Sequence, residues 1–306
     1  MAVAADTVER QLAWEARWRT RAAAAAGAAG LLLVAGTALL QFVVFVGYPS
    51  VGLVQALEPL LTGASSAAVD PRSAGIAFRD HHAAGLIATG AVTAIATALL
   101  AVVLVYLYRA VAFRRPQTPA AARVLALAGP LAAAVLSIAG QVVTAIAAHA
   151  FVAGSDHTHR AAENVFFRSG GLVAVGYLGL ASQFALGFAL IIISLNAMRV
   201  GLLNRFMGVL GIIVGVLFVI PLGTLPVVQA LWFVALAALI SGRWPNGTPP
   251  AWAAGRAIPW PSQQQLREQR QSASSASAPA ADGPPVPAPP RAPASASAKR
   301  RRKKRR

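Results

Sequence analysis

Histidines and carboxylates gather in two short segments of this sequence, at spacings that would suit a metal. The group consists of Asp80, His81, His82, His149, Asp156, His157 and His159. Imidazole and carboxylate ligands suit Zn, Cu(II), Ni or Fe, and the chain has no cysteine to supply a thiolate. Three such ligands would leave one position of a zinc ion open for water. The sequence thus allows a transition-metal or haem site.

Two other interpretations of the same residues stay open. The histidines could form a proton-sensing cluster that titrates near pH ~6.5, or an ordinary polar rim at helix ends. Arg79, Arg160 and Arg168 lie in the same segments, and their positive charge would weaken a metal site. No HExxH or comparable catalytic motif supports an enzyme, so no catalytic residue is assigned.

The elements that must position these groups are strongly apolar. The chain has 306 residues, is 57% hydrophobic and has a mean hydropathy of +0.60, whereas soluble domains are about 45–50% apolar. A membrane-spanning helix needs about 20 apolar residues. Six stretches come near this length and hold none of the ten carboxylates, at 22–48, 83–106, 124–150, 171–197, 206–222 and 225–240. We therefore predict an all-α polytopic membrane bundle with six transmembrane helices over 22–242.

The last two stretches are short, and only a brief turn separates them. A tight helical hairpin is the first interpretation, and a re-entrant pair is the second. The first stretch follows a polar lead and is longer than the apolar region of a signal peptide, so we expect it to remain as an anchor.

The distribution of Lys and Arg predicts the orientation. Most of the 27 basic residues fall on the side that contains both termini. The other side receives Arg72, Arg79, Arg160 and Arg168. Both termini are therefore predicted to be cytoplasmic, and the histidines to lie on the outer face.

The flanking segments differ from the apolar core. Residues 1–21 are predicted to form an interfacial helix or a cytoplasmic extension of the first span. Residues 243–306 form a Pro-, Ser- and Ala-rich tail that is predicted to be disordered over 262–298. The tail ends in eight cations, Lys299, Arg300, Arg301, Arg302, Lys303, Lys304, Arg305 and Arg306. Adhesion to anionic lipid of the inner leaflet is the favoured role. Binding to nucleic acid and a solvated tail without a partner are the alternatives.

Uncharged polar residues recur inside the predicted spans. They are Thr89, Thr93, Thr97, Gln41, Gln141, Gln183 and Gln229. The threonines repeat every four residues and so share one helix face. Packing between helices is the first explanation for them, and a hydrated path for a polar solute is the second. Glycines at 176, 179, 187, 208, 211 and 215 are expected to allow close helix contact.

The stretch from about 198 to 262 carries RFMGVLG at 205–211, WPNG at 244–247 and PAW at 250–252. This stretch resembles multi-pass integral membrane proteins of unknown function in actinobacteria. The resemblance implies a bacterial cytoplasmic membrane and supplies no activity.

Three functions follow as hypotheses. The first is a non-enzymatic scaffold or partner-binding subunit whose basic tail adheres to lipid. The second is a passive transporter or channel for a small polar solute. The third is a metal-binding protein or enzyme that uses the outer-face histidines.

Overall fold

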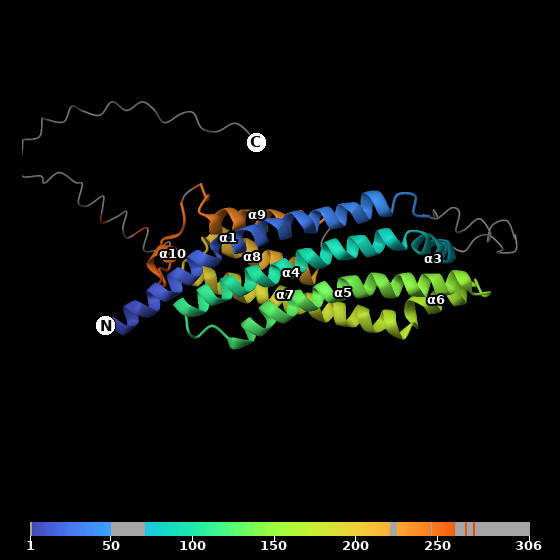
Figure 1. Ribbon diagram of the computed structural model, residues 1–306, viewed down its shortest axis with the longest axis horizontal. Helices are drawn as coiled ribbons and strands as arrows, with labels where there is room; N and C mark the ends of the chain where they lie inside the picture. Colours follow the sequence, from blue (N-terminus) through green and yellow to red (C-terminus); the bar gives the residue numbers. More distant parts are fainter. Residues whose placement is uncertain are drawn as a thin grey trace, which may run out of the picture. The chain divides into compact units, whose positions relative to one another are not determined.

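Four long apolar helices dominate the structure. The computed structural model describes residues 2–49, 71–220, 225–245 and 247–260, together with residues 267 and 272. The four helices are α1 (Ala2–Leu39) with its π-helical continuation η1 (Leu40–Val44), α4 (Ala83–Arg114), α5 (Ala120–Ala153) and α7 (Gly170–Arg199). All four are long and apolar enough to cross a membrane, and Figure 1 shows them side by side. The predicted all-α fold is confirmed for the part of the chain that the structure describes.

The last two apolar stretches form shorter helices, α8 (Arg205–Val219) and α9 (Val227–Ser241). Each has 15 residues, so each is about 22 Å long, shorter than the ~30 Å hydrocarbon core. The turn at 221–224 lies outside the described residues. Figure 1 shows α8 and α9 alongside the half of the bundle nearest α10 (Pro250–Ala254). The hairpin therefore stops well short of the far end of the bundle.

Local capping explains where several helices begin and end. The Asn204 side chain accepts a 2.7 Å hydrogen bond from the Met207 N–H at the start of α8. Thr158 caps α6 (His159–Phe167) by accepting from the Ala161 N–H. Helix α9 ends at Gly242, whose φ of 83° is left-handed, a conformation that glycine adopts without strain.

Neighbouring helices approach closely at glycines. A Cβ atom at Gly187 of α7 would lie 2.6 Å from the Gly215 carbonyl of α8, and a Cβ at Gly215 would lie 2.7 Å from the Gly187 carbonyl. The expected close contact is confirmed at these two glycines, and at Gly208, which faces Met198. Gly176 and Gly179 differ, because a Cβ at either position would meet nothing within 4 Å.

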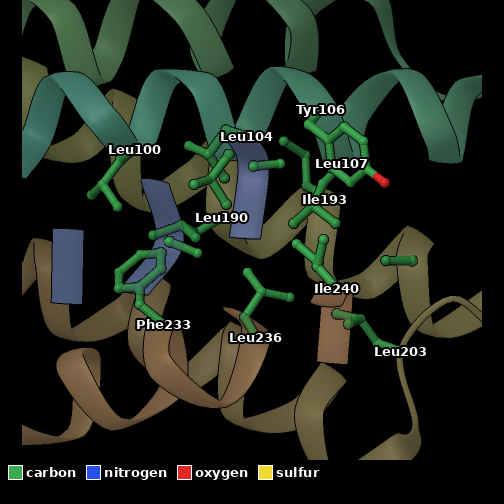
Figure 2. Packing of buried hydrophobic residues seen from close by; sticks show 14 of the residues in the cluster. Leu100, Leu104, Tyr106, Leu107, Leu190, Ile193, Leu203, Phe233, Leu236 and Ile240 are labelled. Atoms are coloured by element: carbon green, nitrogen blue, oxygen red, sulfur yellow. The ribbon is translucent and has the colours of Figure 1, made fainter. Parts of the chain in front are cut away.

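The main core lies between α1, α4, α7, α8 and α9. In Figure 2, Leu100, Leu104 and Leu107 of α4 lie near side chains of α7 and α9, including Leu190 and Phe233. All five side chains are fully buried. Large apolar side chains also remain exposed around the bundle, at Leu31, Phe42, Val135, Ile146, Tyr177 and Leu231 among others. Apolar surface on this scale suits a protein surrounded by lipid.

The two ends of the bundle differ in chemistry. The arginine end is where Glu15 of α1, Arg114 of α4 and Trp252 of α10 meet. The histidine end carries His82, His149 and the short helices α3 (Pro71–His81) and α6. Helix α1 has no break at residue 21, as expected if the segment before the first apolar stretch extends that stretch.

Candidate functional site

A cavity of about 510 Å³ lies beside the tip of the α8–α9 hairpin. Five helices line it, and the described lining residues are Leu33, Thr37, Thr93, Thr97, Gly176, Leu180, Gln183, Leu217, Phe218, Val219, Leu225, Pro226 and Gln229. The last residues of α8 and the first residues of α9 line it beside the longer helices α1, α4 and α7. From Gln183, helix α7 runs about 20 Å further to Gly170.

The threonines of the cavity wall bond to their own helices. The hydroxyl of Thr93 donates to the Thr89 carbonyl at 3.0 Å, and that of Thr97 donates to the Thr93 carbonyl at 2.9 Å. On α1, the Thr37 hydroxyl donates to the Leu33 carbonyl at 2.9 Å. These bonds use each hydroxyl proton and leave oxygen lone pairs as acceptors. The cavity wall therefore presents acceptors along α1 and α4.

Gln183 and Gln229 contribute primary amides from α7 and α9. Both side chains are half-buried, and neither amide has a hydrogen-bond partner among the residues that the structure describes. Each amide offers two N–H donors and a carbonyl acceptor to the cavity. These two groups are therefore set to bond to whatever occupies the cavity, as donor and as acceptor.

The described wall of the cavity is uncharged. None of its lining residues is ionisable among those that the structure describes. Most of the wall is aliphatic or aromatic, with a few polar groups, which is the usual composition of a small-molecule site. The site suits a neutral solute of small size.

The structure separates the polar residues that the sequence singled out. Thr93, Thr97, Gln183 and Gln229 meet at the cavity. Three do not line it. Gln41 is exposed in η1, Thr89 is buried and bonds to the Leu86 carbonyl, and Gln141 packs against Gly90.

Ser137 and Gln141 of α5 contact α4 at Gly90. The Ser137 hydroxyl lies 3.3 Å from the Gly90 carbonyl, and a Cβ atom at Gly90 would lie 2.8 Å from the Gln141 side chain. Gly90 is seven residues before Thr97, so the two positions share a face of α4.

Thr37 is a cavity residue that the sequence pattern did not single out. Thr37 is an isolated threonine in the first apolar stretch. The one sequence feature that could have pointed to it as a polar site residue is its four-residue spacing to Gln41. Four residues place two side chains on one helix face. Gln41 lies in the π-helical segment, is exposed and does not line the cavity.

At the histidine end, two contacts bring predicted metal ligands together. His149 Nδ1 lies 3.2 Å from an Asp80 carboxylate oxygen. The rings of His81 and His82 are 5.1 Å apart, and His82 stacks on Phe78 at 4.0 Å while its Nδ1 faces the Phe78 carbonyl at 2.9 Å. His82 is thus engaged by its own helix.

His157 and Asp156, the predicted metal ligands between α5 and α6, contact residues close to them in the chain. His157 packs on Phe151 and directs Nε2 toward the Val152 carbonyl. Asp156 accepts a 2.9 Å hydrogen bond from the Thr158 N–H, which lowers the pKa of the Asp156 carboxyl. Among the side chains that the structure describes, no three His, Asp or Glu residues gather into a metal-binding group. The side chain of His159 lies outside that set, so the metal site stays a prediction.

The arginine end holds a buried ion pair that sequence reasoning missed. Arg114 contacts both carboxylate oxygens of Glu15, at 2.5 and 3.0 Å. It also donates to the carbonyls of Ala110, Ala251 and Trp252. The one sequence signal was a carboxylate within a basic, tryptophan-containing segment.

The basic tail at 299–306 lies outside the described residues, so its predicted lipid contacts stay a prediction. In comparisons with known proteins, this chain matches no protein-family model, no curated protein and no solved structure.

Proposed function

We propose that the bundle binds a small neutral polar solute in the cavity between α1, α4, α7, α8 and α9, and passes it across the membrane without ion coupling. The observation that carries this proposal is the pair of Gln183 and Gln229 amides, which line one cavity without a described protein partner. A solute with hydrogen-bond donors would meet the hydroxyl oxygens of Thr37, Thr93 and Thr97 at the same time. An amide or a polyol has this chemistry.

The charge distribution supports a neutral solute and a passive path. An ion in this part of the bundle would need compensating charges, because ionised groups are costly in a low-dielectric medium. The described wall provides none. The six apolar stretches also contain no carboxylate that could carry a coupled proton.

For the topology, we propose six membrane-embedded helices with both termini in the cytoplasm, in a bacterial cytoplasmic membrane. The excess of arginine on one side supports this orientation. Contacts between Glu15, Arg114 and Ala251 place the N-terminal segment and residues near 251 at one end of the bundle. An α8–α9 hairpin that enters and leaves at the arginine end is compatible with this topology whether or not its tip reaches the opposite surface.

The test is flux into liposomes. Purified protein in vesicles should accelerate the entry of urea or glycerol, followed by light scattering after rapid mixing. Replacing Gln183 or Gln229 by leucine removes one hydrogen bond to the solute, so flux at low solute concentration should fall about fivefold for each variant. Gln141→Leu is the matched control, because Gln141 lies on α5 outside the cavity. Equal flux in all three variants would reject the proposal.

The scaffold function with a lipid-binding tail stays a second candidate. Its motivation is the run of eight cations at 299–306. Deletion of residues 262–306 tests it through localisation and co-purifying partners. A truncated protein that keeps both unchanged would exclude a role for the tail.

A further inference from the structure

A second cavity opens at the arginine end, on the surface formed by α1, α4 and α5. It has a volume of about 370 Å³ and is almost entirely apolar. Trp14 and Trp18 line one side, Leu127 and Leu131 line another, and Arg109 stands at the mouth. Leu127 and Leu131 are 50% and 42% exposed, so the groove opens toward the surroundings of the bundle. We call it the tryptophan groove.

Two arginines stack on the indoles of this groove: Arg109, which lines it, and Arg21, which lies outside its lining. The guanidinium carbon of Arg109 lies 4.0 Å from the Trp14 ring centroid, and that of Arg21 lies 5.2 Å from the Trp18 ring centroid. Stacking fixes the guanidinium plane and leaves N–H donors at its edge. Neither arginine forms an ion pair with a carboxylate in the described part of the chain. The two indoles therefore hold two positive charges that no described carboxylate pairs, and we call this part of the groove its charged rim.

The length of the groove suits an acyl chain. Its α4 wall runs from Arg109 to Ala98, which is about 16 Å of helix. One leaflet contributes half of the ~30 Å hydrocarbon core, or about 15 Å. Tryptophan also prefers the headgroup boundary, and here two tryptophans lie beside the charged rim.

From this geometry we infer that the tryptophan groove is a binding site for an anionic phospholipid. The phosphate of the lipid bonds to Arg109 and Arg21, and one acyl chain lies along the groove toward Ala98. The site shares no described lining residue with the solute cavity. Basic pockets between transmembrane helices are typical places for anionic headgroups.

Native mass spectrometry of the full-length protein in mild detergent tests this inference. The protein is mixed with equal amounts of phosphatidylglycerol and phosphatidylcholine that carry the same acyl chains. The wild type should retain phosphatidylglycerol preferentially. Arg109→Gln and Arg21→Gln should each reduce that preference about fivefold, and the double variant about 25-fold. Arg199→Gln is the control, since Arg199 is an exposed arginine at the end of α7, outside the groove.

Two further measurements distinguish a specific lipid site from nonspecific electrostatic attraction between the protein and an anionic lipid. Ala98→Phe places a ring in the inner half of the groove and should reduce retention of phosphatidylglycerol while both arginines remain. Soluble glycerophosphate, which has the phosphate without acyl chains, should not displace the bound lipid. The inference fails if the wild type shows no preference, if the Arg109→Gln and Arg199→Gln variants behave alike, if Ala98→Phe has no effect, or if glycerophosphate competes.

Discussion

Glu15 and Arg114, which are 99 residues apart in the chain, form a bidentate ion pair at the arginine end of the bundle. Their side chains are 5% and 0% exposed. The Glu15 carboxylate also accepts from the Gln11 amide at 3.0 Å, and Arg114 reaches the backbone of α10. The pair thus connects α1, α4 and α10, and each charge depends on the other for compensation.

Removing one member of this pair should destabilise the protein strongly. In Glu15→Gln, the buried guanidinium loses its counter-charge, which costs about 3–5 kcal/mol. Thermal unfolding in detergent, followed by circular dichroism, measures the loss, and backbone hydrogen exchange at 250–260 should accelerate. Glu9→Gln is the control, because Glu9 is exposed on the same helix.

The double variant Glu15→Leu with Arg114→Met distinguishes the contribution of the two charges to stability from that of side-chain packing. Replacing both charges by apolar groups removes the desolvation cost together with the attraction. The double variant should therefore be more stable than either single one. If the stability loss of the double variant equals the sum of the losses of the two single variants, Glu15 and Arg114 are not energetically coupled. That result would contradict the mutual compensation of the two charges.

Gly176 offers a way to fill the solute cavity without disturbing helix packing. A Cβ atom there would meet no atom within 4 Å, and the residue lines the cavity. Gly176→Leu should leave the thermal midpoint unchanged or slightly raised, since leucine favours the helix, and should reduce solute flux several-fold. The matched control is Gly179→Leu, which also has open space but does not line the cavity. Equal flux in the two variants would argue against the cavity as the path.

Gly187 should tolerate no side chain. Its Cβ would stand 2.6 Å from the Gly215 carbonyl, so α7 and α8 would have to separate. We expect Gly187→Ala to cost about 1–3 kcal/mol, measured as a lower thermal midpoint in detergent. Gly179→Ala on the same helix should be neutral or stabilising, and a similar loss in both variants would contradict the role of close contact.

Protein stability should depend on pH through the Asp156 carboxyl, whose pKa is lowered by hydrogen bonds from Thr158. The backbone N–H and the side chain of Thr158 lower the pKa of this carboxyl. Because the pKa is lower in the folded state, the stabilisation is present above the unfolded pKa of about 3.9 and is lost as pH falls through the folded value. In Thr158→Val the side-chain contribution disappears while the backbone bond remains. The pKa should then rise part of the way, as measured by carboxyl ¹³C NMR titration; an unchanged value would contradict the assignment.

Several features of the fold could be predicted because they depend on residues close in the chain. Apolar runs of sufficient length specify helices in lipid, and four of them form long helices where expected. Capping by Asn204 and the stop at Gly242 are equally local. The lengths of α8 and α9 could be predicted only in part, since the helices end inside longer apolar runs.

Hydropathy and the lengths of the apolar runs predict helices in apolar surroundings, and the amino-acid sequence identifies the uncharged polar residues within those runs. Which of these polar residues meet depends on tertiary contacts: Thr93, Thr97, Gln183 and Gln229 line one cavity, whereas Gln41 and Gln141 do not. The reason is physical. Periodicity specifies which residues share a face of one helix, but the rotation of each helix is set by contacts with its neighbours, such as Gly187 with Gly215. The pairing of Glu15 with Arg114 likewise depends on helix order, which no local pattern encodes.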